Sequence, residues 1–501
     1  MKKIILICTF VVASASLHAQ APQIDWKRTY GGSGHDGLAA IETLPGGGFI
    51  VAGYTDSADG DILQVPTGMQ DLWLLKTDDD GDILWQKTIG GPNSEMPNDI
   101  AATPDGGFII AGQHSNTNSS GGYDFLIVKT DSEGNVAWQK ILGGTGYETA
   151  HGIHPTPDGG YIVAGESNSD DGDAIPGKGM MDFWVLKLSS DGTIEWQKKL
   201  GGTLNDACWS IQPTADGGYA LAGVTESNDI DVTGNHGMND YWLVKLNANG
   251  NMLWQKTYGG TSIDYGIVMA ITPDGGYLLS GFAFSNDADV TGNHGAGDMW
   301  VIKTNSTGTI EWQKCFGGTN NEVAYDVVVA QDGGYLLGGY GMSADGDLTL
   351  NQGNTDYWVV KLSSTGSLEW QKSMGGTGLD YVKGLRETAD GGVVVAGNSI
   401  SADGDVGSNL GNEDFWVVKL GEETSGFDTP VKQVSVYPNP VNNMLYFSQP
   451  VAAVSLYSVD GKEISTHNNV ESIAINHLAS GLYIAKMQTD NTTQKLTFVK
   501  Q

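Results

Sequence analysis

Acidic residues recur at three fixed positions in this sequence, and carboxylates gathered in this way can bind a metal ion or act as acids and bases. Asp-x-Asp pairs stand in six segments, at Asp59 and Asp61, Asp171 and Asp173, Asp229 and Asp231, Asp287 and Asp289, Asp345 and Asp347, and Asp403 and Asp405. A second set follows a recurring Gly-Gly pair, at Asp36, Glu95, Glu148, Asp206, Asp264, Glu322 and Asp380. A third set precedes hydrophobic segments, at Asp71, Asp124, Asp182, Asp240, Asp298, Asp356 and Asp414.

Two kinds of chemistry could stabilise so many neighbouring carboxylates. Close carboxylates raise one another's pKa unless hydrogen bonds or a cation neutralise them. Asp side chains accept backbone N–H bonds in turns, and we favour this structural role for the second and third sets because of their regularity. Calcium prefers oxygen ligands and is the alternative for the Asp-x-Asp pairs, although none of these segments has the full EF-hand spacing. Calcium is therefore the one candidate cofactor.

Two histidine patterns could suggest a transition metal. The heptapeptide DVTGNHG occurs at 231–237 and again at 289–295, with His236 and His294 in equivalent places. We interpret these histidines as marks of duplication. His151 and His154 form an H-x-x-H pair, but alternation along a strand would point them to opposite faces, which makes a poor metal site.

A long internal repeat positions all of these residues. A tryptophan in a W-x-K motif recurs at Trp26, Trp85, Trp138, Trp196, Trp254, Trp312 and Trp370, and the last four intervals are 58 residues each. Each unit contains four segments rich in β-branched and aromatic residues, separated by turns such as TPDGG. Four-stranded units with this period predict an all-β fold, a seven-bladed β-propeller.

The ends of the repeat region predict how the ring closes. The first W-x-K segment, 24–30, precedes any complete unit, and the last unit ends at 414–420 without such a segment. We therefore expect residues 24–30 to supply the missing strand of the seventh blade. The tryptophans are expected to pack between blades rather than to stack on sugars.

The propeller prediction places the acids on one face. The connections that carry them emerge on the same side of the ring, and the acids after Gly-Gly would lie nearest the channel mouth. Ligand specificity should depend on positions that vary between blades around the first strand, which are His35, Tyr147, His151, Trp209, Tyr265, Tyr325, Tyr381 and Lys383. Aromatic residues beside carboxylates suit a carbohydrate or a peptide.

Composition and charge narrow the partners and the compartment. The net charge of −33 argues against binding to nucleic acid or to an anionic membrane. Residues 1–19 have the lysines, apolar run and small residues of a secretory signal peptide, and no other segment approaches a membrane span. We expect Cys208 and Cys315 to be buried thiols rather than a disulfide.

The sequence changes character after the repeat region at 20–420. A linker is expected at 421–430, and the alternating strands of 431–501 predict a small β-sandwich. This segment resembles the type A C-terminal sorting domain of the type IX secretion system. The matching residues are Tyr437, Pro438, Asn439, Pro440, Gly461, Gly481, Tyr483 and Lys500. The resemblance implies export through the periplasm, recognition by the secretion machinery, and release or attachment at the outer-membrane surface.

Three functions remain open for the exported region. We favour a secreted or cell-surface propeller that binds a glycan or protein ligand or acts as a scaffold, without catalysis. The first alternative is a glycan-active hydrolase or lyase that uses carboxylates at the channel mouth, although no common catalytic motif is present. The second is a structural surface spacer.

Overall fold

The computed structural model of the protein describes residues 20–115, 122–422, 436–437, 440–458, 462–488 and 493–501. The regular secondary structure of these residues consists of β-strands. The predicted signal peptide, most of the predicted linker, and Pro438, Asn439 and Gly461 lie outside these residues. Within the described ranges, no helix is long and apolar enough to cross a membrane. Contacts divide the chain into two units, Met1–Gly426 and Phe427–Gln501.

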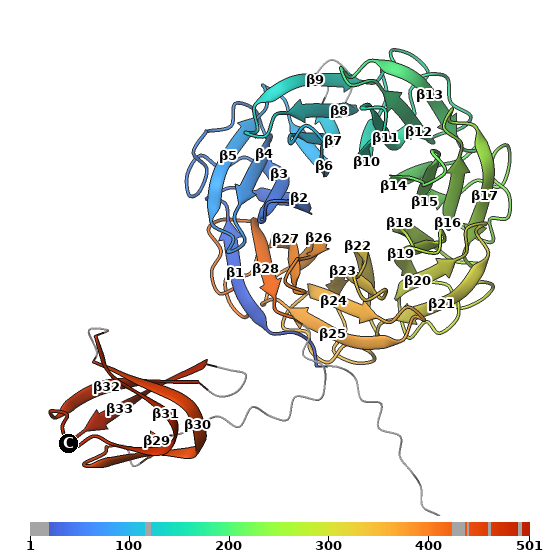
Figure 1. Ribbon diagram of the computed structural model, residues 1–501. Coiled ribbons are helices and arrows are strands. Elements are labelled where there is room, and N and C mark those ends of the chain that lie inside the picture. Colours follow the sequence, from blue (N-terminus) through green and yellow to red (C-terminus); the bar gives the residue numbers. More distant parts are fainter. Residues whose placement is uncertain (1–19, 116–121, 423–435, 438–439, 459–461, 489–492) are drawn as a thin grey trace, which may run out of the picture. The chain divides into compact units, whose positions relative to one another are not determined.

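The described part of the first unit contains seven four-stranded antiparallel sheets, which follow one another around a ring (Figure 1). The innermost strands are β2 (Asp36–Thr43), β6 (Glu95–Ala102), β10 (Glu148–Pro155), β14 (Asp206–Pro213), β18 (Asp264–Ile271), β22 (Glu322–Val329) and β26 (Asp380–Glu387). The second strands are β3 (Phe49–Thr55), β7 (Phe108–Ser115), β11 (Tyr161–Ser167), β15 (Tyr219–Thr225), β19 (Tyr277–Ala283), β23 (Tyr335–Gly341) and β27 (Val393–Ser399).

The outer half of each sheet completes this pattern. The third strands are β4 (Asp71–Thr77), β8 (Tyr123–Thr130), β12 (Asp182–Leu188), β16 (Asp240–Leu246), β20 (Met299–Thr304), β24 (Asp356–Leu362) and β28 (Asp414–Leu420). The outermost strands are β1 (Ile24–Tyr30), β5 (Ile83–Ile89), β9 (Val136–Leu142), β13 (Ile194–Leu200), β17 (Met252–Tyr258), β21 (Ile310–Phe316) and β25 (Leu368–Met374). The architecture is a β-propeller.

One sheet combines strands from both ends of the repeat region. Strand β1 pairs antiparallel with β28, with Ile24 opposite Leu420 and Tyr30 opposite Phe415. The order of this sheet is β1-β28-β27-β26, so that its outermost strand comes from the start of the chain (Figure 1).

The turns between the first and second strands are held by a recurring polar cluster. In the turn before β19, Asp274 accepts hydrogen bonds from the Thr272 hydroxyl (2.5 Å) and the Gly276 N–H (2.9 Å). Gly275 has a φ of +79°, which favours glycine. The buried Lys303 of β20 lies 2.8 Å from the Asp274 carboxylate. These contacts lower the pKa of Asp274 to about 2, chiefly through the hydrogen bonds from Lys303 and Thr272.

Aromatic residues fill the space between neighbouring sheets. Trp254 of β17 packs against Tyr277 of β19 with ring centroids 5.8 Å apart, and five of the six equivalent outer-strand tryptophans make the same aromatic contact with the next sheet. Third-strand aromatics pack in the same way, as in Phe183 and Trp242 at 4.5 Å. The predicted packing of the tryptophans between blades is confirmed.

A β-bulge interrupts every innermost strand at the same repeat position. The pairing register shifts by one residue there, eight residues after the first glycine of the Gly-Gly pair. A bulge re-aims side chains at the point where it occurs. The bulged residues are Ala39, Asn98, His151, Trp209, Ile267, Tyr325 and Lys383.

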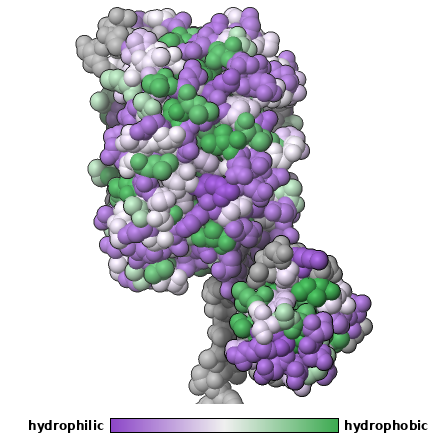
Figure 2. Space-filling view, turned by 90° about the vertical axis from the view of Figure 1, so that its left-hand side faces the viewer, coloured by the Kyte–Doolittle hydropathy of each residue, from purple (hydrophilic) through white to green (hydrophobic). Residues whose placement is uncertain are grey.

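The surface of the repeat region carries no large apolar face on the side that Figure 2 shows, where hydrophobic residues form separate patches among hydrophilic ones. Large hydrophobic residues are nevertheless exposed on outermost strands, including Leu84 of β5, Val136 of β9 and Leu253 of β17. Hydrophobic residues scattered over a surface are common and do not by themselves indicate an interface.

The second unit contains five strands joined in one sheet. They are β29 (Val436–Tyr437), β30 (Met444–Ser458), β31 (Glu463–Ala474), β32 (Gly481–Gln488) and β33 (Thr493–Lys500). The order is β29-β30-β32-β33, with β31 also paired to β30. The long β30 pairs with β29 near its start and with β32 near its end, across a register shift between Tyr446 and Val451. Strand β33 joins the sheet through β32. The small sandwich expected from the sequence stays a prediction.

Candidate functional site

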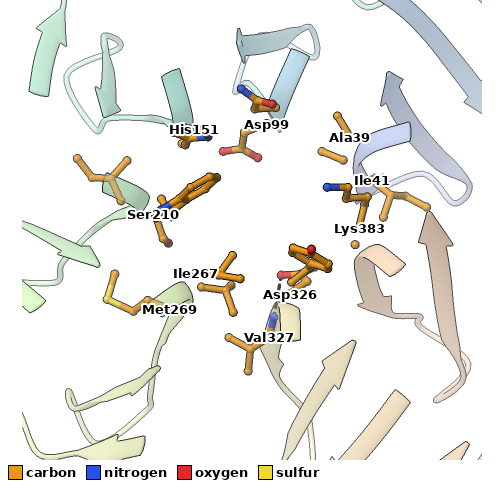
Figure 3. Close-up of a pocket in the computed structure, with 18 of the residues that line it drawn as sticks. Ala39, Ile41, Asp99, His151, Ser210, Ile267, Met269, Asp326, Val327 and Lys383 are labelled. Atoms are coloured by element: carbon orange, nitrogen blue, oxygen red, sulfur yellow. Dashed lines mark hydrogen bonds between the residues drawn. The ribbon is translucent and has the colours of Figure 1, made fainter. Parts of the chain in front are cut away.

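A cavity of about 780 Å³ lies at the centre of the ring and is lined by residues from all seven innermost strands. All seven bulged residues line this cavity. Six of them contribute large or polar side chains, and Ala39 contributes only a methyl group. Figure 3 shows His151, Ser210, Ile267, Asp326 and Lys383 around this space, on different strands. The volume is within the usual range for small-molecule sites.

Aromatic rings form one part of the cavity wall. The Trp209 ring lies 4.1 Å from the His151 ring and 6.0 Å from that of Tyr265, measured between centroids. Tyr265 stacks on Phe282 at 5.6 Å with an interplanar angle of 6°. We call Trp209, Tyr265 and Phe282 the aromatic wall. Flat aromatic surfaces of this kind can pack against sugar rings or other apolar faces.

Lys383 brings a positive charge to the cavity. Its ammonium nitrogen lies 4.6 Å from the ring centroid of Tyr325 and 5.4 Å from that of Tyr381, within cation–π range. No carboxylate of the described residues lies within 4.0 Å of it in an ion pair. Burial lowers the pKa of Lys383, and the more distant charge of Glu413 opposes that shift.

A second cation in the cavity is already neutralised. Arg386 of β26 donates from Nη1 to Asp326 (2.6 Å) and from Nε to Glu42 (3.0 Å), so that three sheets share one ionic cluster. Burial, followed by the positive charge of Arg386, lowers the pKa of His154 to about 4. His154 is therefore neutral at pH 7.

Two carboxylates of the cavity connect neighbouring sheets. Asp99 accepts hydrogen bonds from Ile100 and from Ile153 of the next innermost strand, both at 2.8 Å. Asp326 makes the equivalent contacts with the backbone N–H groups of Val327 and Leu385. Burial raises the pKa of Asp99 to about 7. These two positions were missed from the sequence, because nothing in it distinguishes them from the many other acids.

The acids expected at the channel mouth are buried beneath the loops and do not line the cavity. Asp206 is typical, since it accepts hydrogen bonds from the Gly202 N–H (2.7 Å) and the Ser227 hydroxyl (2.9 Å). Burial raises its pKa to about 6. The same Gly-Gly contact recurs at Asp36, Glu95, Glu148, Asp264, Glu322 and Asp380.

The aspartates that begin the third strands have a matching role. Asp240 accepts bonds from the backbone N–H (2.8 Å) and Nδ1 (2.9 Å) of His236. Asp298 and His294 make the same pair of contacts in the next sheet. The side chains of both histidines are partly exposed and contact a carboxylate that the loop backbone already uses.

The Asp-x-Asp pairs tie a loop within one sheet to the loop that enters that sheet from the preceding one. Asp229 accepts from the backbone N–H of Thr203 (2.9 Å), and Asp231 accepts from that of Gly201 (3.2 Å). Among the described residues, no group of three or more His, Cys, Asp or Glu side chains could hold a metal ion. A calcium ion needs six to eight oxygen ligands, whereas these oxygens face N–H donors. These contacts argue against calcium at the Asp-x-Asp pairs, and the calcium expected there from the sequence remains to be tested.

The positions that vary between the repeats predicted part of the cavity lining. Of the eight variable positions named from the sequence, His151, Trp209, Tyr265, Tyr325, Tyr381 and Lys383 line it, whereas His35 and Tyr147 do not. The expectation that His151 and His154 lie on opposite faces is wrong. Both line the cavity, because His151 is the extra residue of a bulge. The bulge shifts the alternation of side chains along β10 by one position, so that His151 and His154 lie on the same side.

Four landmark residues of the second unit, Tyr437, Gly481, Tyr483 and Lys500, lie in paired strands. Tyr437 pairs with Tyr446 across β29 and β30, and Lys500 lies opposite Gly481 in β32 and β33. The Tyr483 ring stacks on Phe498 at 5.7 Å. Cys208 and Cys315, in the repeat region, are both buried and free, as expected.

The protein combines a β-propeller with a second, C-terminal unit of β-strands. This combination defines an exported cargo protein that carries its own sorting domain. Residues 435–501 match the family model described as a secretion system C-terminal sorting domain, and this segment of the chain is such a domain of the type IX system. It implies interaction with the type IX machinery and secretion to the cell surface or beyond.

Other comparisons extend over the repeat region. The chain is 24% identical over 392 residues to regulatory protein FlaEY of Caulobacter vibrioides, a match that covers 67% of this chain and 40% of that protein. Among solved structures, the WD40 domain of Neurospora crassa Pan2 is 9% identical with a TM-score of 0.45, covering 80% of this chain and 97% of that one. Sqt1 of Chaetomium thermophilum is 14% identical with a TM-score of 0.40, covering 75% and 83%.

Proposed function

We propose that this protein is an exported β-propeller that binds a ligand in its central cavity and does not catalyse a reaction. The bulged position carries the argument. Residues that hold the sheets together are nearly the same in all repeats, whereas Ala, Asn, His, Trp, Ile, Tyr and Lys occupy the seven bulges that line the cavity. A scaffold alone has no need for this asymmetry, but a specific binding site does.

The proposal includes a route of export. Residues 1–19 act as a signal peptide that takes the chain to the periplasm, and the sorting domain then delivers it across the outer membrane. The seven sheets form one closed seven-bladed propeller, which the pairing of β1 with β28 and the aromatic packing between sheets support.

Binding can be tested on the full chain with an array of oligosaccharides and short peptides. The test variant is Trp209→Ala, which removes the largest ring of the aromatic wall. The matched control is Leu84→Ala, an exposed hydrophobic residue on an outermost strand. The proposal expects at least one probe to bind the wild type and the control but not Trp209→Ala. If no probe binds, the function as a structural spacer is favoured. If all three proteins bind a probe alike, the protein binds a ligand but the cavity is not the site.

A second candidate function, glycan hydrolysis, is supported by one observation. Asp99 and Asp326 come from different sheets, and their environments differ: burial raises the pKa of Asp99 to about 7, whereas Arg386 lies against Asp326. A proton donor and an ionised partner are what such hydrolysis requires. Against it, backbone N–H groups already bind both carboxylates. Release of reducing ends from a glycan panel, abolished in Asp99→Asn and Asp326→Asn, would establish this activity.

A further inference from the structure

We infer that the cavity binds an acidic oligosaccharide, whose carboxylate pairs with Lys383 and whose sugar ring packs on the aromatic wall around Trp209. This inference rests on the proposed function and names the chemical class of the ligand. It is carried by the surroundings of Lys383, by the charge of the cavity and by the spacing of the two groups around the ring.

Lys383 differs from the other lysines of the repeat. Six of the seven third-strand lysines are buried with a carboxylate partner, as in Lys245 with Asp216 (2.9 Å) and Lys187 with Asp158 (2.9 Å), whereas Lys76 is only partly buried. Buried Lys199 donates to the backbone carbonyls of Ser167 and Ser169. Lys383 has two aromatic rings beside it and no carboxylate within ion-pair distance among the described residues. A partly buried cation without such a partner favours an anion from outside.

Glu413, the acid whose charge acts on Lys383, is already hydrogen-bonded. The Glu413 carboxylate accepts a hydrogen bond from the Tyr381 hydroxyl at 2.7 Å. Burial raises the pKa of Tyr54 to about 12, and the charge of Glu413 adds to this shift. The Tyr381 phenol therefore binds Glu413, while the ammonium of Lys383 remains available to a ligand.

The charge of the cavity contrasts with that of the chain. The protein has 59 acidic residues and a net charge of −33, yet the residues that line the cavity include no glutamate and only two aspartates, Asp99 and Asp326. The charge of Asp326 is neutralised by Arg386, and Asp99 is bound by two N–H groups. A carboxylate that enters the cavity therefore meets Lys383 without a free carboxylate lining the same space.

The distance around the ring sets the size of the ligand. Trp209 lies on β14 and Lys383 on β26, with β18 and β22 between them in chain order. Both side chains line the same cavity of about 780 Å³. A ligand that contacts both must extend across this space, which suits a short oligosaccharide better than a single sugar.

Calorimetry on the full chain tests the inference with trigalacturonic acid and with its fully methyl-esterified form. The two probes have the same rings and differ in their carboxylates. We expect the acid to bind at least about tenfold more tightly than the ester, because a charge-assisted contact contributes that much or more. Lys383→Gln should remove the difference, whereas Lys256→Gln, which changes an exposed lysine, should preserve it.

Each other outcome overturns the inference in a distinguishable way. If acid and ester bind equally and Trp209→Ala abolishes both, the ligand is a neutral saccharide and the proposed function remains. If only peptides bind, the ligand class is wrong and the proposed function again remains. If nothing binds, both are wrong. The comparison of acid with ester uses the wild-type chain, so it stands even if Lys383→Gln fails to fold.

Discussion

Asp182 and Asp206 belong to neighbouring sheets, yet both carboxylates lie against the same residue, Gly201. A Cβ atom on Gly201 would lie 2.2 Å from Oδ1 of Asp182 and 2.7 Å from Oδ2 of Asp206. Both aspartates are buried, and the charge of Asp182 adds to the raised pKa of Asp206. The first glycine of the Gly-Gly pair is therefore required because two carboxylates occupy the space of a side chain.

Replacement of this glycine should destabilise the propeller. We expect Gly201→Ala to lower the free energy of unfolding by about 1–3 kcal/mol, the usual cost of forcing extra atoms into a packed site. Thermal melting followed by circular dichroism measures the change. Gly46→Ala is the control, since a Cβ there would meet nothing within 4 Å. Equal melting temperatures for the two variants would contradict this packing argument.

The stability of the fold should pass through a maximum in mildly acidic solution. Burial raises the pKa of Asp206, Asp356 and Asp414 to about 6 from 3.8. The folded state then binds more protons than the unfolded state between these values, so these groups cost stability as the pH rises from about 4 to 6.

The turn aspartates act in the opposite direction. Hydrogen bonds and a lysine lower the pKa of Asp216 and Asp274 to about 2. Their contribution is present above pH 4 and is lost as the pH falls toward 2. Melting temperatures measured from pH 2 to pH 8 should therefore peak near pH 4. A steady rise in stability from pH 5 to pH 8 would show that the buried acids are not protonated as described.

Calcium should leave the stability of the protein unchanged. The Asp-x-Asp carboxylates accept backbone N–H bonds, and a calcium ion would have to break these contacts before it could bind. We expect the same melting temperature in millimolar calcium and in chelator. An increase of several degrees with calcium, lost in Asp229→Asn, would instead show that the loops bind the ion.

Removal of the sorting domain should stop export at the periplasm. A chain that ends at residue 426 lacks the segment that matches the sorting family but keeps the repeat region. Cell fractionation should then find the truncated protein in the periplasm and the full chain at the surface or in the medium. A second deletion that removes only residues 1–19 should retain the protein in the cytoplasm. Surface delivery of the first variant would overturn the assigned role.

The sequence predicted the repeat well because each strand is marked by local patterns. The W-x-K tryptophans fix the outermost strands and TPDGG-type turns fix the start of the second strands, as at Tyr277. Pattern alone also suggested turn-capping roles for Asp206 and Asp240, which have such contacts in the structure.

The cavity was harder to predict, because side-chain direction there depends on a bulge. Period-two alternation separates His151 from His154, and only the extra residue in β10 brings both to the channel. Asp99 and Asp326 were not singled out for a different reason. Each binds an N–H group of the following innermost strand, a contact between segments more than 50 residues apart that no local pattern reports.

The pairing of β1 with β28 has a consequence for the order in which the chain can fold. Strands β1 and β28 are separated in the chain by almost the entire repeat region, so their sheet cannot be completed until β28 has been synthesised. Contacts between such distant segments form late and slowly. The ring therefore stays open during most of synthesis, and it closes only when β28, the last strand of the repeat region, is present to pair with β1.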